Sequence, residues 1–407
     1  MTTVQPVYLP ALGMVCALGD SRDTILRNLD DGSRAGMVMR DDLLPGREVF
    51  VGAVHTALPD ASTLPLPFRS RNNQLLLAAL SQIRAETDAT INRFGANRIA
   101  VVLGSSTSGI SDGETALQKK TAAENIFPAG FDYRQQEMGN PAQCLAHVLA
   151  LDTIAYTIST ACSSSGKAIA AAARLLHSGV CDAVLCGGVD SLCQMTVQGF
   201  AALDSVARTY CNPFREHRDG ITIGEGAALF LMTRDNFFTR PVFKKNINPV
   251  RLLGAGEASD AFHISAPDPA GAGAEFAIRA ALTAADLSPA DIDYINLHGT
   301  GTRKNDEMES QLVARIFGND TPCSSTKGMT GHTLGAAGAI EAGLCWLALS
   351  SDTAKRKMPP HIADGVPDPA LPSLRFCRHE FFHREPAIVM SNSFAFGGNN
   401  ISLILSG

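Results

Sequence analysis

The sequence predicts an α/β fold with well-buried sheets, and three observations support that class. Short β-branched runs such as residues 98–104 and 182–188 alternate with Ala- and Leu-rich stretches such as 166–179, as strands alternate with helices. The strand-like runs are nearly continuous apolar stretches, which is typical of sheets covered on both faces. The 407 residues are 45% hydrophobic, enough to bury a large core without metal or disulfides.

The chain divides into two α/β blocks. The stretch 233–250 interrupts the alternation with charges, asparagines and two prolines, so it is the best candidate for a junction. We therefore expect an N-terminal half, residues 1–240, and a C-terminal half, residues 241–407. No fixed-period repeat or low-complexity tract is visible, which argues against solenoid and disordered architectures.

Charge and apolar patterning exclude several classes of protein. There are 34 basic and 40 acidic residues, a net charge of −6, which is unlike the basic stripe of a nucleic-acid-binding protein. No stretch reaches the roughly 20 apolar residues of a membrane span, and the first twenty residues lack the features of an export signal. We expect a cytoplasmic protein whose partners include neither nucleic acid nor membrane.

The ten cysteines are scattered through apolar surroundings. Without an export signal, reduced thiols are expected rather than disulfides. The closest set, Cys181, Cys186 and Cys193, has neither the CxxC spacing nor the nearby histidines of a zinc site. We therefore expect no metal.

Cys162 stands apart from the other nine cysteines. It lies in the segment TIAYTISTACSSSGKAIAAAARLL, which predicts a strand, a tight turn of small residues and a long helix. Free amides and the helix dipole at a helix N-terminus favour thiolate over thiol, and Ser, Ala and Gly leave room for a substrate. Most cysteines in such a chain are small buried hydrophobes, but this context predicts an activated nucleophile.

A second Gly-rich turn presents a histidine. In DIDYINLHGTGTRKNDEMES a strand ends at His298, and a Gly/Thr loop leads into a helix with Asp306 and Glu309. Strand ends are where α/β proteins place catalytic groups. A lone histidine is more often structural than catalytic, but HGTGT supplies hydroxyls and bare backbone beside this one.

A third turn, in SSTKGMTGHTLGAAGAIEAG, places Lys327 and His332 before a Gly/Ala helix that contains Glu341. Such a small-faced helix should pack closely against a neighbour. Glu341 in this apolar helix is costly unless paired, so Lys327 is its expected partner; the alternative is a solvated surface lysine. One cysteine and two histidines without an acid in a triad role suit thioester chemistry better than peptide hydrolysis, with donors aimed at an oxyanion or enolate.

A fourth segment, SNSFAFGGNN at 391–400, alternates aromatic residues and glycines, which suits close backbone approach to a ligand or a moving loop. By itself it equally suits an ordinary turn. Together with TACSSS, HGTGT and TKGMTGHTLGAAG, in this order across nearly the whole chain, it resembles the elongating β-ketoacyl-acyl carrier protein (ACP) synthases of type II fatty acid synthesis.

The resemblance implies a thiolase fold of two similar halves in a layered α-β-α-β-α arrangement, usually as a homodimer. It implies an acyltransferase that condenses an acyl-enzyme thioester with malonyl-ACP by decarboxylation, with no cofactor beyond the phosphopantetheine of ACP. Cys162 would carry the acyl group, and His298 and His332 would stabilise the enolate and polarise the malonyl thioester. The backbone N–H groups of Cys162 and Phe394 would bind the oxyanion, and Phe394 would also gate the acyl pocket. Thr300 and Thr302 would bind the pantetheine arm. Four charged residues would support the site: Lys327, Glu341, Asp306 and Glu309.

The second histidine decides among relatives. Initiating and chalcone-type synthases carry Asn there, and thiolases bring a second catalytic cysteine, whereas Cys377 lies outside any Gly-rich turn. Two other functions stay open: a non-catalytic, chain-length-factor-like subunit of a heterodimer, although such partners characteristically lose the cysteine, and a thiolase that acts on CoA esters. An active synthase paired with a related subunit also stays open.

Several positions depart from the family pattern or extend it. The family usually has Gly-Gly-Thr-Asn where this chain has Asn399 and Asn400 after its two glycines, in the loop that carries the gate. Thr107 takes the place of the residue that floors the acyl pocket, with Phe200 as a second pocket residue. A polar floor suits an unsaturated or oxygenated chain, as in polyene or polyketide assembly.

Docking of ACP is predicted from charge alone. The loop within 200–218 is shorter than the family loop that often helps to dock ACP, so family docking residues do not transfer. Carrier proteins are acidic, and steering them needs cations. Our candidates are Arg69, Arg71 and Arg208, with ordinary solvated charge as the alternative.

Overall fold

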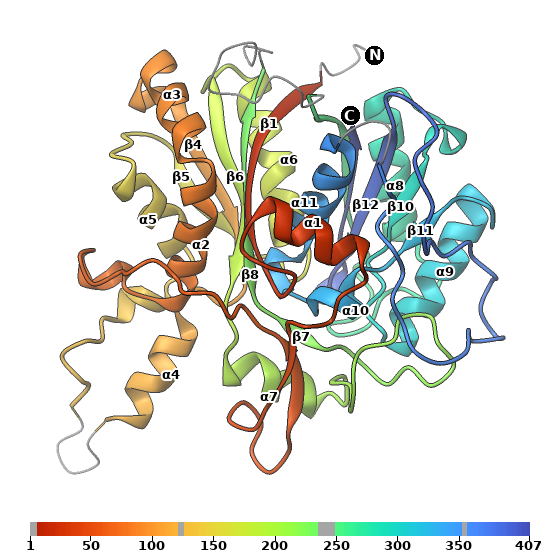
Figure 1. Ribbon diagram of the computed structural model, residues 1–407, viewed down its shortest axis with the longest axis horizontal. Coiled ribbons are helices and arrows are strands. Elements are labelled where there is room, and N and C mark those ends of the chain that lie inside the picture. Colours follow the sequence, from red (N-terminus) through yellow and green to blue (C-terminus); the bar gives the residue numbers. More distant parts are fainter. Residues whose placement is uncertain (1–5, 121–125, 235–248, 352–355) are drawn as a thin grey trace.

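The computed structural model describes residues 6–120, 126–234, 249–351 and 356–407. The half boundary expected at residue 240 lies outside these ranges. Two sets of five strands join into one ten-stranded sheet through an antiparallel contact between the first strands of the two sets, where Val7 faces Leu252 and Tyr8 faces Arg251 (Figure 1). Within the described ranges, no helix is long and apolar enough to cross a bilayer.

The two strand sets repeat one topology. Numbered 1 to 5 along the chain, both sets run 1-5-4-2-3 outward from the join. Strands 1, 5 and 4 are antiparallel neighbours, and strands 4, 2 and 3 are parallel, in both sets. The first set is β1 (Val7–Val15), β4 (Ile99–Gly104), β5 (Ala155–Ile158), β6 (Ala183–Asp190) and β8 (Gly226–Thr233), and the second is β9 (Arg251–Ser259), β10 (Tyr294–Asn296), β11 (Cys323–Ser324), β12 (Ile388–Phe394) and β13 (Asn399–Ser406). The expectation of two similar α/β halves is confirmed.

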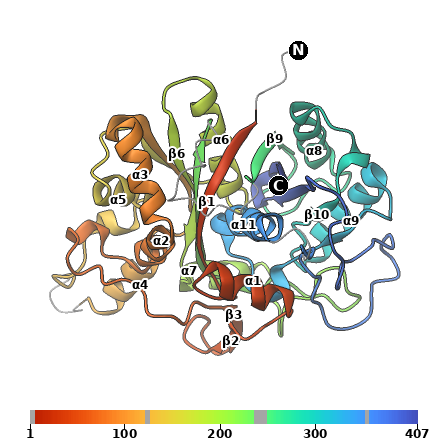
Figure 2. The same cartoon turned by 45° about the horizontal axis from the view of Figure 1, so that its top comes forward.

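Helices cover the outer faces of both strand sets and also fill the space between the two sets. The layers are visible from two directions in Figures 1 and 2, and apolar clusters fill each boundary between layers. The first outer layer contains α2 (Arg71–Gln82), α3 (Arg84–Phe94) and α5 (Asn140–Val148); the central layer α6 (Ser164–His177) and α11 (Ala337–Ser350); the second outer layer α8 (Ala272–Ala285) and α9 (Arg303–Phe317). This is the five-layer arrangement of the expected thiolase fold.

The two central helices approach closely because both are rich in small residues. A Cβ atom at Gly338 of α11 would lie 2.9 Å from the backbone nitrogen of Gly166 on α6, which a real side chain does not tolerate. The close packing predicted for the Gly/Ala helix is therefore confirmed. Because α11 is buried over nearly its whole length, its one carboxylate, Glu341, needs a partner inside the protein.

A small sheet connects the periphery to the centre. It consists of β2 (Met37–Arg40), β3 (Val49–Gly52) and β7 (Ile223–Gly224). Ile223 of β7 also forms a bridge with His332, so this sheet helps to place a predicted site residue. The remaining described helices are α1 (Arg22–Asp30), α4 (Ile110–Gln118), α7 (Gln194–Ala202) and the short α10 (Lys327–Thr330).

Candidate active site

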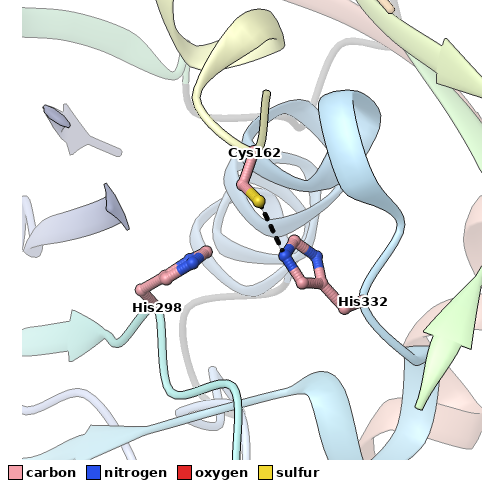
Figure 3. Close-up of side chains that lie close together, drawn as sticks. All are labelled: Cys162, His298 and His332. Carbon is pink, nitrogen blue, oxygen red and sulfur yellow. Dashed lines mark hydrogen bonds between the residues drawn. The ribbon is translucent and has the colours of Figure 1, made fainter. Parts of the chain in front are cut away.

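Turns from both halves meet at the centre of the molecule. Cys162 lies between β5 and α6, His298 follows β10, and His332 lies between β11 and α11. Figure 3 shows the thiol and the two imidazoles close together, with a hydrogen bond between Cys162 and His332. The structure thus brings together the three residues singled out from the sequence, although they are up to 170 residues apart in the chain.

The turn that carries Cys162 is strained and buried. Ala161, just before it, has a left-handed φ of 52°, which is unfavourable for a residue with a side chain and is typical of functional turns. Cys162 is 4% exposed, and burial raises its pKa to about 11, although Lys327 and the backbone N–H of Phe396 act in the opposite direction. Burial therefore opposes the activation expected from the N-terminus of the helix that begins at Ser164.

A thiol with so high a pKa needs a base, and His332 is in place to act as one. Its Nε2 lies 3.0 Å from Sγ of Cys162. Burial, followed by Lys327, lowers the pKa of His332 well below its usual value, so the ring is neutral near pH 7. Nδ1 has no hydrogen-bond partner among the described residues. Because no contact fixes the tautomer, Nε2 can accept the thiol proton or donate to an oxygen.

Backbone hydrogen bonds hold His332 where the thiol needs it. Its N–H donates to the carbonyl of Thr222 at 2.6 Å, and its carbonyl accepts the N–H of Gly224 at 2.9 Å. A further strained residue follows, since Leu334 has a φ of 51°. The backbone on both sides of His332 therefore helps to hold its imidazole beside the thiol.

Lys327 orients His298. Its Nζ donates to the carbonyl of His298 at 2.5 Å and lies 3.4 Å from Nδ1 of the same residue. Since an ammonium group only donates, Nδ1 is the acceptor and the ring proton lies on Nε2. Burial, then Lys327 and His332, lower the pKa of His298 well below its usual value. The ring is therefore a neutral N–H donor, with its centroid 5.3 Å from that of His332.

Buried carboxylates support this arrangement from behind. Lys327 forms an ion pair with Glu341, as the sequence predicts, and burial raises the pKa of Glu341 to about 7. Glu309 accepts the N–H groups of His298 and Gly299, both at 2.7 Å. Asp306 accepts the N–H of Phe214 at 2.8 Å and that of Gly301 at 3.3 Å. Burial also raises the pKa of Glu309 to about 7 and that of Asp306 to about 6.

Two phenylalanines share the roles expected of Phe394 alone. Phe394 ends β12, pairs with Asn400 and packs its ring 6.2 Å from that of His298. The backbone N–H that reaches the Cys162 thiol belongs to Phe396, in the turn after the strand. The ring of Phe396 lies 5.5 Å from that of Phe200. The backbone contact therefore favours Phe396 over Phe394 as the oxyanion donor, since Phe394 is still paired within the strand. Both side chains line the cavity at Cys162, so the gating role of Phe394 stays a prediction.

Two neighbouring cavities lie in front of the thiol. The outer one has a volume of about 530 Å³, and the inner one, bounded by Cys162, both histidines and Phe200, has about 20 Å³. Pro267, Thr302 and Phe396 line both. About 10–15 Å³ is enough for one water molecule, so the inner cavity is too small for an acyl chain unless a wall moves. The hydroxyls of Thr300 and Thr302, 2.9 Å apart, lie at this passage, where pantetheine binding was predicted.

Thr107, the predicted pocket floor, lines neither of these two cavities. Its hydroxyl donates to Asp190 at 2.9 Å and accepts the N–H of Ser191 at 3.1 Å, so its polar group is bound within the protein. Its role as a pocket floor stays a prediction. Asp190, fully buried at the end of β6, was missed because no motif marks it. Its carboxylate also accepts the Ser105 hydroxyl and the N–H groups of Ser106, Thr107 and Ala336.

The predicted docking arginines differ in their surroundings. Arg71 binds the buried carboxylate of Glu225 at 2.5 Å, while its own side chain stays 40% exposed. Part of its charge is therefore balanced within the protein, and its docking role stays a prediction. Arg69 and Arg208 are exposed and stay predictions. The exposed Arg303 and Lys304 line the outer cavity. The sequence contained a signal for them, because both directly follow HGTGT.

The reactive groups also form a set of potential metal ligands. One donor atom each of Cys162, His298 and His332 lies within 4.8 Å of the other two. Such soft donors suit Zn²⁺, and an ion held there would occupy the thiol. The expectation of no metal therefore stays a prediction.

Comparisons with known proteins agree with the motifs. Residues 6–236 match the family model described as "Beta-ketoacyl synthase, N-terminal domain", and residues 250–362 match "Beta-ketoacyl synthase, C-terminal domain". The chain is 31% identical to Nodulation protein E of Rhizobium meliloti (strain 1021), over 98% of both chains. It is also 31% identical to 3-oxoacyl-[acyl-carrier-protein] synthase 2 of Staphylococcus aureus, over 82% of this chain and 83% of the relative.

Solved structures show the same similarity. A ketosynthase (ApeO) from Xenorhabdus doucetiae, determined in complex with its chain length factor (ApeC), is 47% identical with a TM-score of 0.90, over 99% of this chain and 98% of the other. The ishigamide ketosynthase/chain length factor is 27% identical with a TM-score of 0.84, over 99% of both chains.

Proposed function

The chain belongs to the beta-ketoacyl synthase family, and from that premise we propose that it joins an acyl group held on Cys162 to malonyl-ACP and releases β-ketoacyl-ACP. One observation carries the proposal: a buried thiol lies 3.0 Å from a neutral imidazole, with a second neutral imidazole beside it, at the inner end of a cavity. This arrangement combines a nucleophile, a proton acceptor and neutral donors. It belongs to a condensing enzyme of the acyltransferase class.

In the first step, the acyl group moves from ACP to the enzyme. The thiol of Cys162 adds to the thioester carbonyl while its proton passes to Nε2 of His332. The backbone N–H groups of Cys162 and Phe396 donate to the oxyanion. The carbon–sulfur bond to pantetheine then breaks, and the departing sulfur takes the proton. Acyl-Cys162 and ACP with a free thiol result.

In the second step, malonyl-ACP loses CO₂. Nε2–H groups of His298 and His332 donate to the thioester oxygen of the malonyl group, and the electron pair of the breaking carbon–carboxylate bond becomes the enolate. The enolate carbon attacks the carbonyl of acyl-Cys162, the carbon–sulfur bond breaks, and the thiolate takes up a proton from solvent. Neutral imidazoles suit this step, because each can donate to the oxygen without a net charge to desolvate. Both acyl groups arrive on ACP, and the proposal assigns no cofactor to the chain itself.

Acyl carrier protein is the proposed partner in both steps. The outer cavity is open to solvent, and exposed Arg303 and Lys304 stand beside Thr302 at its wall. Cations in this place can attract the acidic carrier and guide its arm inward. We therefore add Arg303 and Lys304 to the arginines predicted from the sequence as docking candidates.

A related subunit is proposed as a second partner. The similar structures named above include ketosynthases together with chain length factors. In this chain β5 is the last strand at one edge of the sheet and is only half-buried, and such an open edge is a template for pairing. We propose a heterodimer in which this chain is the active member, because it keeps Cys162, His298 and His332 in contact distance. A homodimer is the alternative outcome on native mass spectrometry.

Other chemistry is less consistent with the site. A thiolase needs a second reactive cysteine, but Cys377 is buried beside Met358 and lies in a different part of the fold.

To test the proposal, wild type and Cys162→Ala are incubated with acyl-ACP or acyl-CoA, then with malonyl-ACP, and followed by intact-mass spectrometry. We expect an adduct from acyl-ACP that is absent in the variant, followed by CO₂ and β-ketoacyl-ACP. Absence of an adduct across chain lengths, alone and with a chain-length-factor subunit, would reject the catalytic role.

A further inference from the structure

Lys167, on the helix that follows the Cys162 turn, is hydrogen-bonded to the turn that carries the proposed oxyanion donor. Nζ of Lys167, on α6, donates to Oδ1 of Asn399 at 3.0 Å and lies 3.7 Å from Glu257 of β9. Glu257 also binds Arg174 at 2.5 Å. Because α6 belongs to the first half and residues 257 and 399 to the second, this contact joins the halves next to the site.

Asn399 controls the turn 395–399, which carries Phe396. Its carbonyl accepts the N–H of Ala395 at 2.9 Å and so closes the turn. Gly397 and Gly398, between them, have φ values of 81° and 76°, in the region that glycine enters without cost and that leaves the backbone free to move. The N–H of Phe396 reaches the Cys162 thiol from the same turn. A shift of Asn399 therefore moves this donor.

Other anchors of the turn come from the second half. The N–H of Gly397 donates to the carbonyl of Ile264 at 2.9 Å, and the carbonyl of Gly398 accepts the N–H of Asp260 at 2.8 Å. Neither anchor is linked to the helix that carries the nucleophile. The bond from Lys167 supplies that link, since Lys167 lies five residues after Cys162, on the helix that follows the nucleophile turn.

We propose that Lys167 and Asn399 are positioning residues that hold the Phe396 N–H in register with Cys162, so that the two halves keep the oxyanion site aligned. The inference rests on the proposed acyl transfer. It also accounts for Asn399, which stands where a threonine is usual in the family: the amide oxygen of Asn lies one bond further from the backbone than a threonine hydroxyl, and it reaches the lysine.

Two reactions of Cys162 separate positioning from general structural damage. Acylation by acyl-ACP needs both an accessible thiol and the oxyanion donor, whereas alkylation by iodoacetamide needs only the accessible thiol. We expect Lys167→Met and Asn399→Leu each to slow acylation about tenfold, less than the 100- to 1,000-fold effect of removing an oxyanion donor outright. Alkylation should become about fivefold faster, because a lost hydrogen bond loosens the turn over the thiol.

Matched variants complete the test. Arg174→Met removes the other partner of Glu257 without touching Asn399, and should change neither rate. Lys167→Arg should recover most of the acylation rate, and the Lys167→Met/Asn399→Leu double variant should be no slower than either single variant, because both remove the same bond.

Three outcomes would overturn the inference: unchanged rates, equal losses in both reactions, or additive losses in the double variant. If wild type is alkylated but never acylated, the proposed function fails separately, and the alkylation rates alone then decide whether Lys167 holds the turn.

Discussion

The two halves share one topology but divide the chemistry between them. Cys162 and His332 occupy the same place in each half, between the third strand and the central helix. Each turn contains a left-handed residue other than glycine, Ala161 in one and Leu334 in the other. The repeated topology therefore supplies a strained turn in each half, one carrying a cysteine and the other a histidine.

The turns after the second strand show a different solution to one problem. In the second half, Glu309 on α9 binds the backbone of the His298 turn. In the first half, Asp190 at the end of β6 binds the backbone of the turn at 105–107. Both halves use a buried carboxylate to fix the turn, but they take it from different elements.

The largest expected effect comes from replacing either of the two site histidines, which both belong to the second half. His298→Ala and His332→Ala should each lower the rate of condensation by about 1,000-fold, because each removes a donor to the enolate. They should differ in the first step, since His332 alone contacts the thiol: acylation should be slow in His332→Ala and within about threefold of wild type in His298→Ala. Single-turnover kinetics with acyl-ACP and malonyl-ACP check both, and equal acylation in the two variants would contradict the division of roles.

The second effect concerns the ion pair behind His298. Lys327→Met leaves Glu341 buried without a partner and should lower the free energy of unfolding by about 3–5 kcal/mol. Lys327→Met/Glu341→Leu removes both charges and should recover most of that loss, although condensation stays slow because His298 loses its orienting contact. Urea unfolding monitored by circular dichroism measures this, and an equally unstable double variant would show that the pair itself stabilises the fold.

The third prediction tests the parallel between the two supporting carboxylates. Asp190→Asn and Glu309→Gln keep the shape but lose the charge that binds several backbone donors, and each should lower the free energy of unfolding by about 2 kcal/mol. Asp31→Asn, an exposed control, should change it by less than about 0.5 kcal/mol. A large loss in only one of the two buried variants would break the parallel.

The last prediction concerns the pH dependence of the first half alone, where the change at each pH unit is smaller than the effects above. Burial raises the pKa of Cys162 to about 11, so little thiolate is present near pH 7 and its fraction grows as the pH rises. Alkylation by iodoacetamide should therefore become about tenfold faster per pH unit from 7 to 10. A plateau reached by pH 8 would mean a far lower pKa and would support the view that the helix N-terminus activates the thiol.

The site could be predicted from short motifs because each of its reactive residues is positioned by the turn in which it lies. Each reactive residue lies in a Gly- or Ser-rich turn between a strand and a helix, and the residue types in those turns are readable from the sequence. The pairing of Lys327 with Glu341 was also predictable, since a carboxylate in an apolar helix needs a cation. The layered fold was predicted because these motifs resemble those of the elongating β-ketoacyl-ACP synthases, and their spacing alone would not have predicted it.

What could not be predicted depends on contacts between distant segments. Arg71 meets Glu225 across 154 residues and Thr107 meets Asp190 across 83, and nothing local marks either carboxylate as a partner. The choice between Phe394 and Phe396 depends on where β12 ends. The pKa of Cys162 depends on how completely later segments bury the thiol, which the dipole argument did not include.

The strand order also has a consequence for how the protein is made. Each half closes its sheet by pairing its last strand with its first, β8 on β1 and β13 on β9. During vectorial synthesis the first half can complete its sheet before the second half has formed. The face of α6 that packs against α11 is then open to solvent, and the nascent chain carries an apolar surface prone to self-association. The thiol comes into contact with His332 only when α11 packs on that surface. The reactive groups therefore come together in the same step that removes the apolar surface from solvent.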